Sequence, residues 1–570
     1  MKHKKSKIGI ILKNTLIILF VIFIAFVIYY QRITHITLPE IHDMQALELE
    51  PVQHNKNTFS INKNWLRKSQ SGLWEMYLEG DAFELGVFNG KLTKDLIQKQ
   101  ELAFVDQINK IIPSKFYLKF LKYFTAWFNR DIDDHIPEEY LKEIYGVSFS
   151  CSSEFNYISP SYERMLNYHA THDIGHALQD LALVGCTSFA VNMNKENDQL
   201  LIGRNFDFYI NAEFAENKII AFVDPANGYR FTYITWASMI GVVSGMNDQG
   251  LTVTINAAKS EVPTKSATPI SIVAREILQY ASNFEEAIAI AKKRQVFVSE
   301  SILIGSAHNN SALVIEKSPS KMGIYNINND YLVCSNHFQS NTFLNDETNL
   351  ENIAESASFY REERCSQLIS NIDTISYLQT ASVLRDRSGI NGKDIGIGNE
   401  KAMAQMISHH SVIFQPEKLI VWVSTQPWQL GEYVAYELNN IFNLENIPTE
   451  DSLLNDTSLT IPEDSFLNSS TFSDYLQYKK WKDAISVHIV DEKRMNNEEA
   501  FFNDFVKLNP EYYYTYILSG DYFAEFGQYE KAKMFYEKAL TKELETEQNE
   551  LDLLERLIEV EKELSTNFTN

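Results

Sequence analysis

The chain has 570 residues, which is too long for one ordinary domain and predicts two or three. Its hydrophobic content of 45 % and charged content of 22 % are ordinary for a globular protein. The net charge of -24 argues against nucleic acid as a partner, because phosphate backbones require a basic surface. No close Cys/His spacing suggests a structural zinc site, and four cysteines in so long a chain do not form a disulfide framework: Cys151, Cys186, Cys334 and Cys365.

The N-terminus carries a targeting signal. Clustered lysines precede an apolar stretch from Ile8 to Tyr30. With Lys13 extended toward the head groups, this stretch reaches the roughly 20 residues that a bilayer span needs. No small-residue cleavage pattern follows, which favours an uncleaved signal-anchor over residues 1–30 rather than a removed signal peptide. Positive flanks stay cytoplasmic, so we expect a single-pass membrane protein whose remainder lies on the extracytoplasmic side.

The next two segments lead to the first cysteine of interest. Residues 31–73 are polar and mixed, and are interpreted as a stalk. Residues 74–185 show mainly helical patterns and are interpreted as a helical N-terminal segment. Within this segment, Lys115 to Phe128 is rich in Phe, Tyr and Leu. We expect it to be part of the core, with the lining of a groove as the alternative.

Three histidines recur at helical spacing near the end of that segment: His169, His172 and His176. Three histidines on one helix face can ligate zinc. The alternative is a polar helix face that packs near the nucleophile or faces solvent. No carboxylate or cysteine motif accompanies these histidines, so we assign no metal.

The stretch from Val184 to Asp207 predicts a β-hairpin. Alternating apolar residues follow the Gly185-Cys186 pair, a polar turn spans 194–198, and a second apolar run returns toward Asp207. A turn centred near residue 196 would bring Arg204 beside Ser188 and Asp207 just past Cys186. A slip of one residue would turn these side chains to the other face of the hairpin.

The remaining chain predicts a β-rich domain over 186–445, a linker over 446–490 and a helical region over 491–570. Strands, helices and strands again suggest two layers of sheet with helices outside. The predicted strands are 219–223, 229–234, 240–243, 251–255, 301–305, 312–316, 323–327, 331–334, 411–414 and 418–424, and the predicted helices are 270–293, 356–370 and 375–385. Residues 520–540 resemble one tetratricopeptide repeat, which cannot bury its own face and is expected to pack on the main domain.

Cys186 has the context of a nucleophile. A thiol reacts as its thiolate, and a nearby cation such as Arg204 lowers its pKa. The chain has no papain-type or caspase-type cysteine context, no Gly-x-Ser-x-Gly elbow and no His-Glu-x-x-His helix. The remaining base is the α-amino group of Cys186, which becomes available only if the Gly185–Cys186 bond is cut. Its pKa of about 8 suits proton transfer, and Asp207 would hold it in place.

These residues resemble the cysteine branch of the N-terminal-nucleophile hydrolases. This branch includes choloylglycine hydrolases, penicillin V acylases and self-processing acyl-coenzyme A:6-aminopenicillanate acyltransferases. Cys186-Thr187, followed by the stretch 203–207, resembles their nucleophile and Gly-Arg-Asn-x-Asp strand. Gly185-Cys186 lies deep in the chain, which resembles the acyltransferase junction rather than the short leader of bile salt hydrolases. The resemblance covers about residues 75–440.

Three further positions complete the resemblance. The turn at 245–251 followed by Asn256 looks like the family's turn, strand and oxyanion asparagine, and Asn336 looks like its second active-site asparagine. Arg361 resembles the active-site arginine, with Arg364 as the alternative. The implied catalytic set is Cys186, Arg204, Asp207, Asn256, Asn336 and Arg361. A buried core cysteine, a structural ion pair and strand-end caps are the alternative interpretations of these residues.

The resemblance implies an α+β, four-layer αββα N-terminal-nucleophile hydrolase fold, here with a transmembrane helix and a small TPR-like appendage. It implies self-cleavage at Gly185–Cys186 and hydrolysis of a linear C–N bond in a small N-acyl substrate through a Cys186 thioester. No cofactor is required. The first alternative is an acyltransferase that moves an acyl group from a thioester to an amine. The second is a non-catalytic, membrane-anchored interaction protein.

Overall fold

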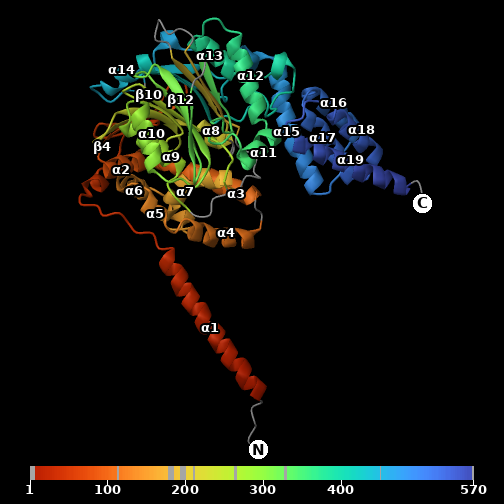
Figure 1. Ribbon diagram of the computed structural model, residues 1–570, viewed down its shortest axis with the longest axis horizontal. Helices are drawn as coiled ribbons and strands as arrows, with labels where there is room; N and C mark the ends of the chain where they lie inside the picture. The colour runs from red at the N-terminus through yellow and green to blue at the C-terminus, as the bar shows by residue number, and fades with distance from the viewer. Residues whose placement is uncertain are drawn as a thin grey trace, which may run out of the picture.

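The computed structural model describes residues 7–111, 114–177, 185–192, 200–208, 212–261, 266–326, 330–449 and 451–567. A body of two β-sheets and surrounding helices forms most of this structure (Figure 1). A long helix projects from one side of the body, and a group of C-terminal helices lies against another side. The architecture is mixed α and β, as the sequence predicts.

The larger sheet has eleven strands in the order β1-β2-β3-β4-β7-β8-β9-β10-β11-β12-β13. Neighbours are antiparallel except β4 and β7, which pair in parallel from Trp74↔Ile219 to Gly80↔Pro225. The strands are β1 (Val52–Asn55), β2 (Thr58–Ile61), β3 (Asn64–Lys68), β4 (Trp74–Gly80), β7 (Ile219–Pro225), β8 (Phe231–Thr235), β9 (Ser244–Asn247), β10 (Leu251–Ala257), β11 (Glu300–Ser306), β12 (Ser311–Lys317) and β13 (Met322–Asn326).

The smaller sheet has six antiparallel strands in the order β14-β5-β6-β15-β16-β17. They are β5 (Thr187–Val191), β6 (Leu201–Phe206), β14 (Tyr331–Cys334), β15 (His410–Gln415), β16 (Ile420–Ser424) and β17 (Tyr433–Glu437). The two sheets share an apolar core in which Ile202 and Val412 of the smaller sheet meet Leu303 of the larger. Burial on both sides explains why the central strands consist almost wholly of buried residues.

Helices cover the outer sides of the two sheets. Ile277 of α9 belongs to the same core cluster as Val253 of the larger sheet. On the smaller sheet, Ile369 of α12 and Leu384 of α13 pack with Trp422. The helices of this part are α8 (Ala212–Glu216), α9 (Ile270–Tyr280), α10 (Phe284–Lys293), α11 (Glu347–Glu355), α12 (Ser358–Ser370), α13 (Tyr377–Leu384) and α14 (Leu438–Phe442).

The predicted strand at 240–243 is shifted in the structure, where the strand is β9, Ser244–Asn247. The backbone N–H of Ile240 donates to His169 Nε2 over 3.0 Å, and that of Val242 donates to the Ser271 carbonyl over 2.9 Å. These amides therefore bond to residues on helices and not to a neighbouring strand. Strand β17 is an addition that the sequence did not predict.

The predicted stalk at 31–73 is wrong. Residues 52–68 supply β1, β2 and β3, which extend the larger sheet. Trp74–Gly80, expected within a helical segment, is strand β4. The segment looks solvated in sequence because some of its polar groups pair internally: Arg67 Nε lies 2.6 Å from Glu75 Oε2, and both side chains are buried.

The rest of the N-terminal segment is helical, as predicted. Its helices are α2 (Ala82–Leu92), α3 (Lys94–Ile111), α4 (Lys115–Phe128), α5 (Ile132–His135), α6 (Glu138–Ser148) and α7 (Ser161–Ala177). Helices α2 and α6 approach closely at Gly86. A Cβ at this position would stand 1.9 Å from the Glu143 carbonyl oxygen, so only glycine permits the approach. The expectation that Lys115 to Phe128 lies in the core is wrong, since α4 presents several aromatic side chains to the outside.

The C-terminal helices pack on the main body, as predicted. They are α15 (Ser470–Val490), α16 (Glu498–Leu508), α17 (Tyr513–Glu525), α18 (Tyr529–Ala539) and α19 (Glu547–Asn567). Met406 and Leu430 of the body share their core cluster. The predicted linker over 446–490 is helical in its second half, because Tyr478 and Ile485 of α15 are buried in that cluster.

Helix α1 (Lys7–Ile33) projects from the body (Figure 1). Its segment Ile11–Ile33 has 23 residues, a mean hydropathy of 2.7 and no buried part. It is the one helix among the described residues that is long and apolar enough to cross a membrane.

Candidate active site

The hairpin of β5 and β6 has the predicted register. Ser188 pairs with Arg204 and Thr187 with Asn205, so Asp207 lies just beyond Cys186. The N–H of Gly185 donates to the Asp207 carbonyl over 3.0 Å, which continues the pairing one step past Cys186. The predicted turn at 194–198 lies wholly within 193–199, outside the described residues. The predicted meeting of the thiol, the cation and the carboxylate at one end of the hairpin is confirmed.

Arg204 is held beside the thiol of Cys186. Its Nη2 lies 3.8 Å from Cys186 Sγ. The guanidinium also donates to the carbonyl of Val243 over 2.6 Å and, by shorter contacts, to the Ile255 carbonyl and the Ser244 hydroxyl. These acceptors belong to or adjoin β9 and β10, so the larger sheet fixes a cation that the smaller sheet supplies.

Burial outweighs the cation in setting the acidity of the thiol. Cys186 is 1 % exposed, and burial raises the pKa of its thiol to about 11. Arg204 lowers that pKa, as the sequence predicts, while the charges of Asp207 and Glu300 raise it further. The thiol is therefore protonated at neutral pH in the uncut chain, and its reaction requires a proton acceptor.

One carboxylate oxygen of Asp207 accepts a hydrogen bond and the other does not. Its Oδ1 accepts a short hydrogen bond from the Ser408 hydroxyl, while Oδ2 is buried with no hydrogen-bond partner. Burial raises the pKa of Asp207 to about 7, against lowering effects of Ser408, Arg361 and Arg204. A buried oxygen without a donor is unfavourable by about 1–3 kcal/mol. This oxygen therefore has the capacity to accept a donor that the uncut chain does not supply.

The two asparagines connect the ends of strands around this site. Asn256 Nδ2 donates to the carbonyls of Cys334 and Ser335 over 2.8 and 3.2 Å, and its Oδ1 accepts from Ser188 Oγ over 2.9 Å. Asn336 Nδ2 donates to the Ala257 carbonyl over 3.0 Å. Both amides tie the ends of β10 and β14 together, and the donors of Asn256 are occupied by backbone carbonyls.

Arg361 faces the site, whereas Arg364 does not. The Arg361 guanidinium donates to Thr187 Oγ1 over 3.2 Å and to Asn336 Oδ1 over 2.6 Å. It also interacts electrostatically with Cys186 and Asp207. The alternative, Arg364, is held by the Asp386 carboxylate through two hydrogen bonds of 2.9 Å.

The C-terminal helices contact the segment that holds Arg361. Arg361 Nη1 donates to the carbonyl of Glu400 over 2.8 Å, and the N–H of Glu400 donates to Glu545 Oε1 over 2.8 Å. Glu545 Oε2 accepts in turn from the Tyr513 hydroxyl over 2.6 Å. One residue, Glu400, therefore connects the segment between α18 and α19 to a residue of the site.

Gln405 belongs to the site but was missed in the sequence. Its Nε2 donates to the carbonyl oxygen of Gly185 over 2.6 Å, and its side chain is buried. A Cβ on Gly185 would stand 2.3 Å from Gln405 Oε1, so a side chain at position 185 would displace the Gln405 amide from this contact. Gln405 lies 220 positions after Gly185 in a loop without a periodic pattern, so no local signal identifies it.

The histidine row is not assembled as a metal site in the part that the structure describes. Ring nitrogen Nε2 of His169 accepts from the Ile240 N–H over 3.0 Å, and Nδ1 lies 2.7 Å from the Met165 carbonyl. The backbone thus engages both nitrogens. The side chains of His172 and His176 lie outside those described. Among the described side chains, no group of three His, Cys, Asp or Glu residues is arranged to hold a metal.

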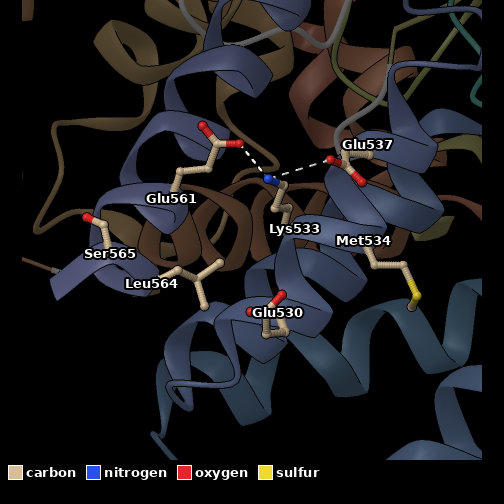
Figure 2. Close-up of a pocket in the computed structure, with 7 residues that line it drawn as sticks. All are labelled: Glu530, Lys533, Met534, Glu537, Glu561, Leu564 and Ser565. Carbon is tan, nitrogen blue, oxygen red and sulfur yellow. Dashed lines mark hydrogen bonds and ion pairs between the residues drawn. The ribbon is translucent and has the colours of Figure 1, made fainter. Parts of the chain in front are cut away.

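A surface pocket of about 500 Å³ lies between α18 and α19, away from the candidate residues (Figure 2). Lys533 extends from α18 into ion pairs with Glu561 at 2.6 Å and Glu537 at 3.9 Å. None of the six predicted catalytic residues lines this pocket. We therefore place the chemistry at the hairpin and not here.

One protein-family model matches the central part of the chain. Residues 193–425 match the family model described as acyl-coenzyme A:6-aminopenicillanic acid acyl-transferase. The matched range includes Arg204, Asp207 and both asparagines, together with Arg361. The resemblance to the acyl-coenzyme A:6-aminopenicillanate acyltransferase family is thereby confirmed for this part of the chain, while Cys186 lies outside the matched range.

Two curated relatives are similar over part of their length. An uncharacterized protein from Archaeoglobus fulgidus is 24 % identical over 277 residues, covering 45 % of this chain and 45 % of that protein. Protein dcd1B from Dictyostelium discoideum is 22 % identical over 269 residues, covering 44 % of this chain and 51 % of that protein. The chain spans about half the length of the curated relatives it matches.

Solved structures with a partial likeness include the Caenorhabditis elegans ortholog of N-acylethanolamine-hydrolyzing acid amidase. It is 17 % identical with a TM-score of 0.30, covering 41 % of this chain and 93 % of that one. A variant of the conjugated bile acid hydrolase from Clostridium perfringens is 17 % identical with a TM-score of 0.30, covering 45 % and 93 %.

Proposed function

We propose that this chain is a self-processing cysteine amidohydrolase that cleaves a linear C–N bond in a small N-acyl substrate. One observation carries the proposal. The thiol of Cys186, the cation of Arg204 and the unpartnered oxygen of Asp207 converge at a peptide carbonyl that Gln405 holds. The site thus contains a nucleophile, a scissile carbonyl with a hydrogen-bond donor, and an acceptor for the amine that cleavage would create.

Self-cleavage would proceed by an acyl shift within the junction. Cys186 Sγ attacks the carbonyl carbon of Gly185, and the Gln405 N–H stabilises the oxyanion that forms. The C–N bond then breaks, and the nitrogen of Cys186 takes the thiol proton. The products are a thioester on Cys186 and a free α-amine. Water hydrolyses the thioester, which leaves Gly185 as a carboxylate and Cys186 with a free thiol and amine.

The cut chain would then act on its substrate with the same groups. The α-amine of Cys186 takes the proton from the thiol, and Asp207 Oδ2 accepts a hydrogen bond from that amine. The thiolate attacks the substrate carbonyl, the leaving amine takes the proton, and water resolves the acyl thioester. Asn256 and Asn336 are the proposed oxyanion donors. Asn256 can act this way only if one of its two bonds to backbone carbonyls is released, and the 3.2 Å bond to Ser335 is the longer one.

We expect Gln405→Ala to slow self-cleavage by about 10²–10³-fold, the loss typical of one oxyanion donor. The measurement is the rate at which residues 186–570 appear as a separate band on a denaturing gel. Gln429→Ala is the matched control, because Gln429 is also fully buried and its side-chain amide has no hydrogen-bond partner. Equal cleavage rates in the wild type and Gln405→Ala would rule out this role.

The family match keeps acyl transfer as the alternative activity, because its model describes an acyltransferase. We expect the processed protein to release free acid and free amine from an N-acyl amide. Incubation with an acyl thioester and an acceptor amine is the discriminating experiment. New amide without net hydrolysis would make transfer the main reaction. A chain that stays in one piece and whose Cys186 does not react with iodoacetamide would favour the non-catalytic interaction protein.

The finer architecture belongs to the same proposal. Residues 186–445 are proposed as a catalytic domain of the four-layer αββα type, supported by two facing sheets with helices on their outer sides. The α17–α18 pair is proposed as the TPR-like unit within 491–570, supported by the contact of Gly520 with the Tyr536 ring. Residues 1–30 are proposed as a signal-anchor, supported by the length and exposure of α1, with the catalytic domain on the extracytoplasmic side.

A further inference from the structure

Helix α4 presents an unusual exposed face. Five aromatic side chains on it are between 41 % and 59 % exposed: Tyr117, Phe120, Tyr123, Phe124 and Trp127. Their spacing places them along one side of the helix. Neighbouring rings contact one another along this row, including Phe120 with Phe124 and Phe124 with Trp127. A contiguous exposed aromatic surface of this kind marks a contact with a partner or a membrane.

The end of α1 lies against this helix. The Tyr30 hydroxyl donates to the backbone carbonyl of Tyr123 over 2.7 Å, and the two rings meet edge to face at 6.0 Å. A few residues later, the N–H of Thr37 donates to Asp133 Oδ2 over 3.0 Å. Figure 1 shows α4 along the side of the body from which α1 projects. The exit of α1 is therefore tied to α4 at Tyr123 and to α5 at Asp133.

This contact sets the depth of α4 relative to a bilayer. The apolar segment Ile11–Ile33 is about 35 Å long at 1.5 Å per residue, slightly more than the hydrocarbon core. Tyr30 lies in its last turn, where tyrosines stand at the level of the head groups. Because Tyr123 touches Tyr30, α4 lies at that same level.

The charge of α4 fits a head-group surface as well. Its sequence holds Lys115, Lys119 and Lys122 and no acidic residue, although the whole chain has a net charge of -24. Arg130, just beyond its end, lies 4.9 Å from the centre of the Trp127 ring. A helix that combines lysines with an aromatic face is typical of helices that lie in the plane of a membrane interface.

We propose that α4 is a second membrane contact, which lies in the head-group region of the bilayer that α1 crosses and holds the catalytic body against the lipid surface. The proposal rests on the proposed anchor α1. Lipid is the partner that we propose for this face, because α4 adjoins the one helix among the described residues that is long and apolar enough to span a membrane. The experiment distinguishes lipid from a second copy of the chain bound to the same face.

Trp127 is a natural reporter of this contact. All seven tryptophans lie among the described residues, and Trp127 alone is exposed. The full chain is reconstituted into phosphatidylcholine vesicles with or without brominated acyl chains, and tryptophan emission is recorded. Brominated lipid is expected to quench the wild type, and Trp127→Phe is expected to lose most of that quenching. Trp428→Phe, in the C-terminal core cluster, is the matched control and should retain it.

A second variant keeps the reporter. Phe120→Ser with Phe124→Ser is expected to weaken the quenching of Trp127 and shift its emission to the red. Quenching that is absent in the wild type, or unchanged in Trp127→Phe, would overturn the proposal. The chain can also be reconstituted into lipid nanodiscs and its copies counted. Two copies per nanodisc that become one in the Phe120 and Phe124 variant, with no quenching by brominated lipid, would mean that α4 contacts a second copy of the chain instead of lipid. Failure of the chain to float with vesicles would instead refute the anchor α1.

Discussion

Replacing Cys186 by alanine is expected to leave the chain as one band on a denaturing gel, whereas the wild type separates into residues 1–185 and 186–570. The thiol is the only nucleophile at the junction in this mechanism, so its loss should reduce cleavage below detection. N-terminal sequencing of the 186–570 band should identify Cys186 as its first residue. The same variant should have no amidase activity, because it lacks the nucleophile of both reactions.

The two pieces are expected to stay together until the protein is denatured. Strand β4 belongs to the N-terminal piece and pairs in parallel with β7 of the C-terminal piece over seven residues, from Trp74↔Ile219 to Gly80↔Pro225. Strand β3 lies on its other side, so cleavage leaves the sheet intact. Size-exclusion chromatography should give one peak that contains both pieces, and urea should separate them.

Two further cysteine variants make this result specific. Cys365→Ala alters a cysteine that is equally buried but lies on α12, and it should cleave like the wild type. Cys186→Ser keeps a weaker nucleophile and should cleave more slowly. A wild-type chain that remains whole, or a Cys186→Ala chain that is cut at residue 186, would contradict the proposed chemistry.

Local patterns explain which parts of the site could be predicted. Alternation and a turn fix the register of a hairpin, so Arg204 and Asp207 could be placed relative to Cys186 before the structure was known. Gln405 could not, because a contact between residues 220 positions apart depends on the packing of whole elements. Polarity was misleading at 31–73, because Arg67 of this segment forms a buried ion pair with Glu75 of β4.

Burial was the property that the sequence predicted least well. The aromatic run at Lys115 to Phe128 has the composition of a core helix, yet composition does not say which surface covers it. The acidity of Cys186 shows the same difficulty. A neighbouring arginine was correctly expected to lower the thiol pKa, but the larger effect of burial depends on the two sheets closing over the site.

Asp207→Asn is expected to reduce amidase activity by up to about 10²–10⁴-fold, the range that a general base contributes, because Asp207 holds the α-amine that acts as the base. The asparagine keeps the shape of the side chain but lacks the charge that holds the α-amine of Cys186. Activity is normalised to the amount of 186–570 band, so that an effect on cleavage is not counted as an effect on turnover. Activity within a few-fold of the wild type would exclude Asp207 as the group that holds the amine.

The same substitution should have the opposite effect on the uncut chain. In Cys186→Ala, no amine forms, and Asp207 keeps a buried oxygen without a donor. Burial raises its pKa from 3.8 to about 7, so the folded chain holds a proton that the unfolded chain releases near pH 4. This group therefore weakens stability progressively as pH rises through that interval. Asp207→Asn removes the titration and should stabilise the uncut chain above pH 7.

Urea unfolding of Cys186→Ala, with and without Asp207→Asn, measures this effect. The difference in stability between the two chains should be small near pH 4, grow as pH rises and level off above about pH 7. Taking the difference cancels groups that both chains share, including Glu545, whose pKa burial also raises to about 7. A difference that does not change with pH would mean that Asp207 is already stabilised as an anion before cleavage. A carboxylate that destabilises the uncut chain and supports turnover in the cut one is what a site prepared for a newly formed amine requires.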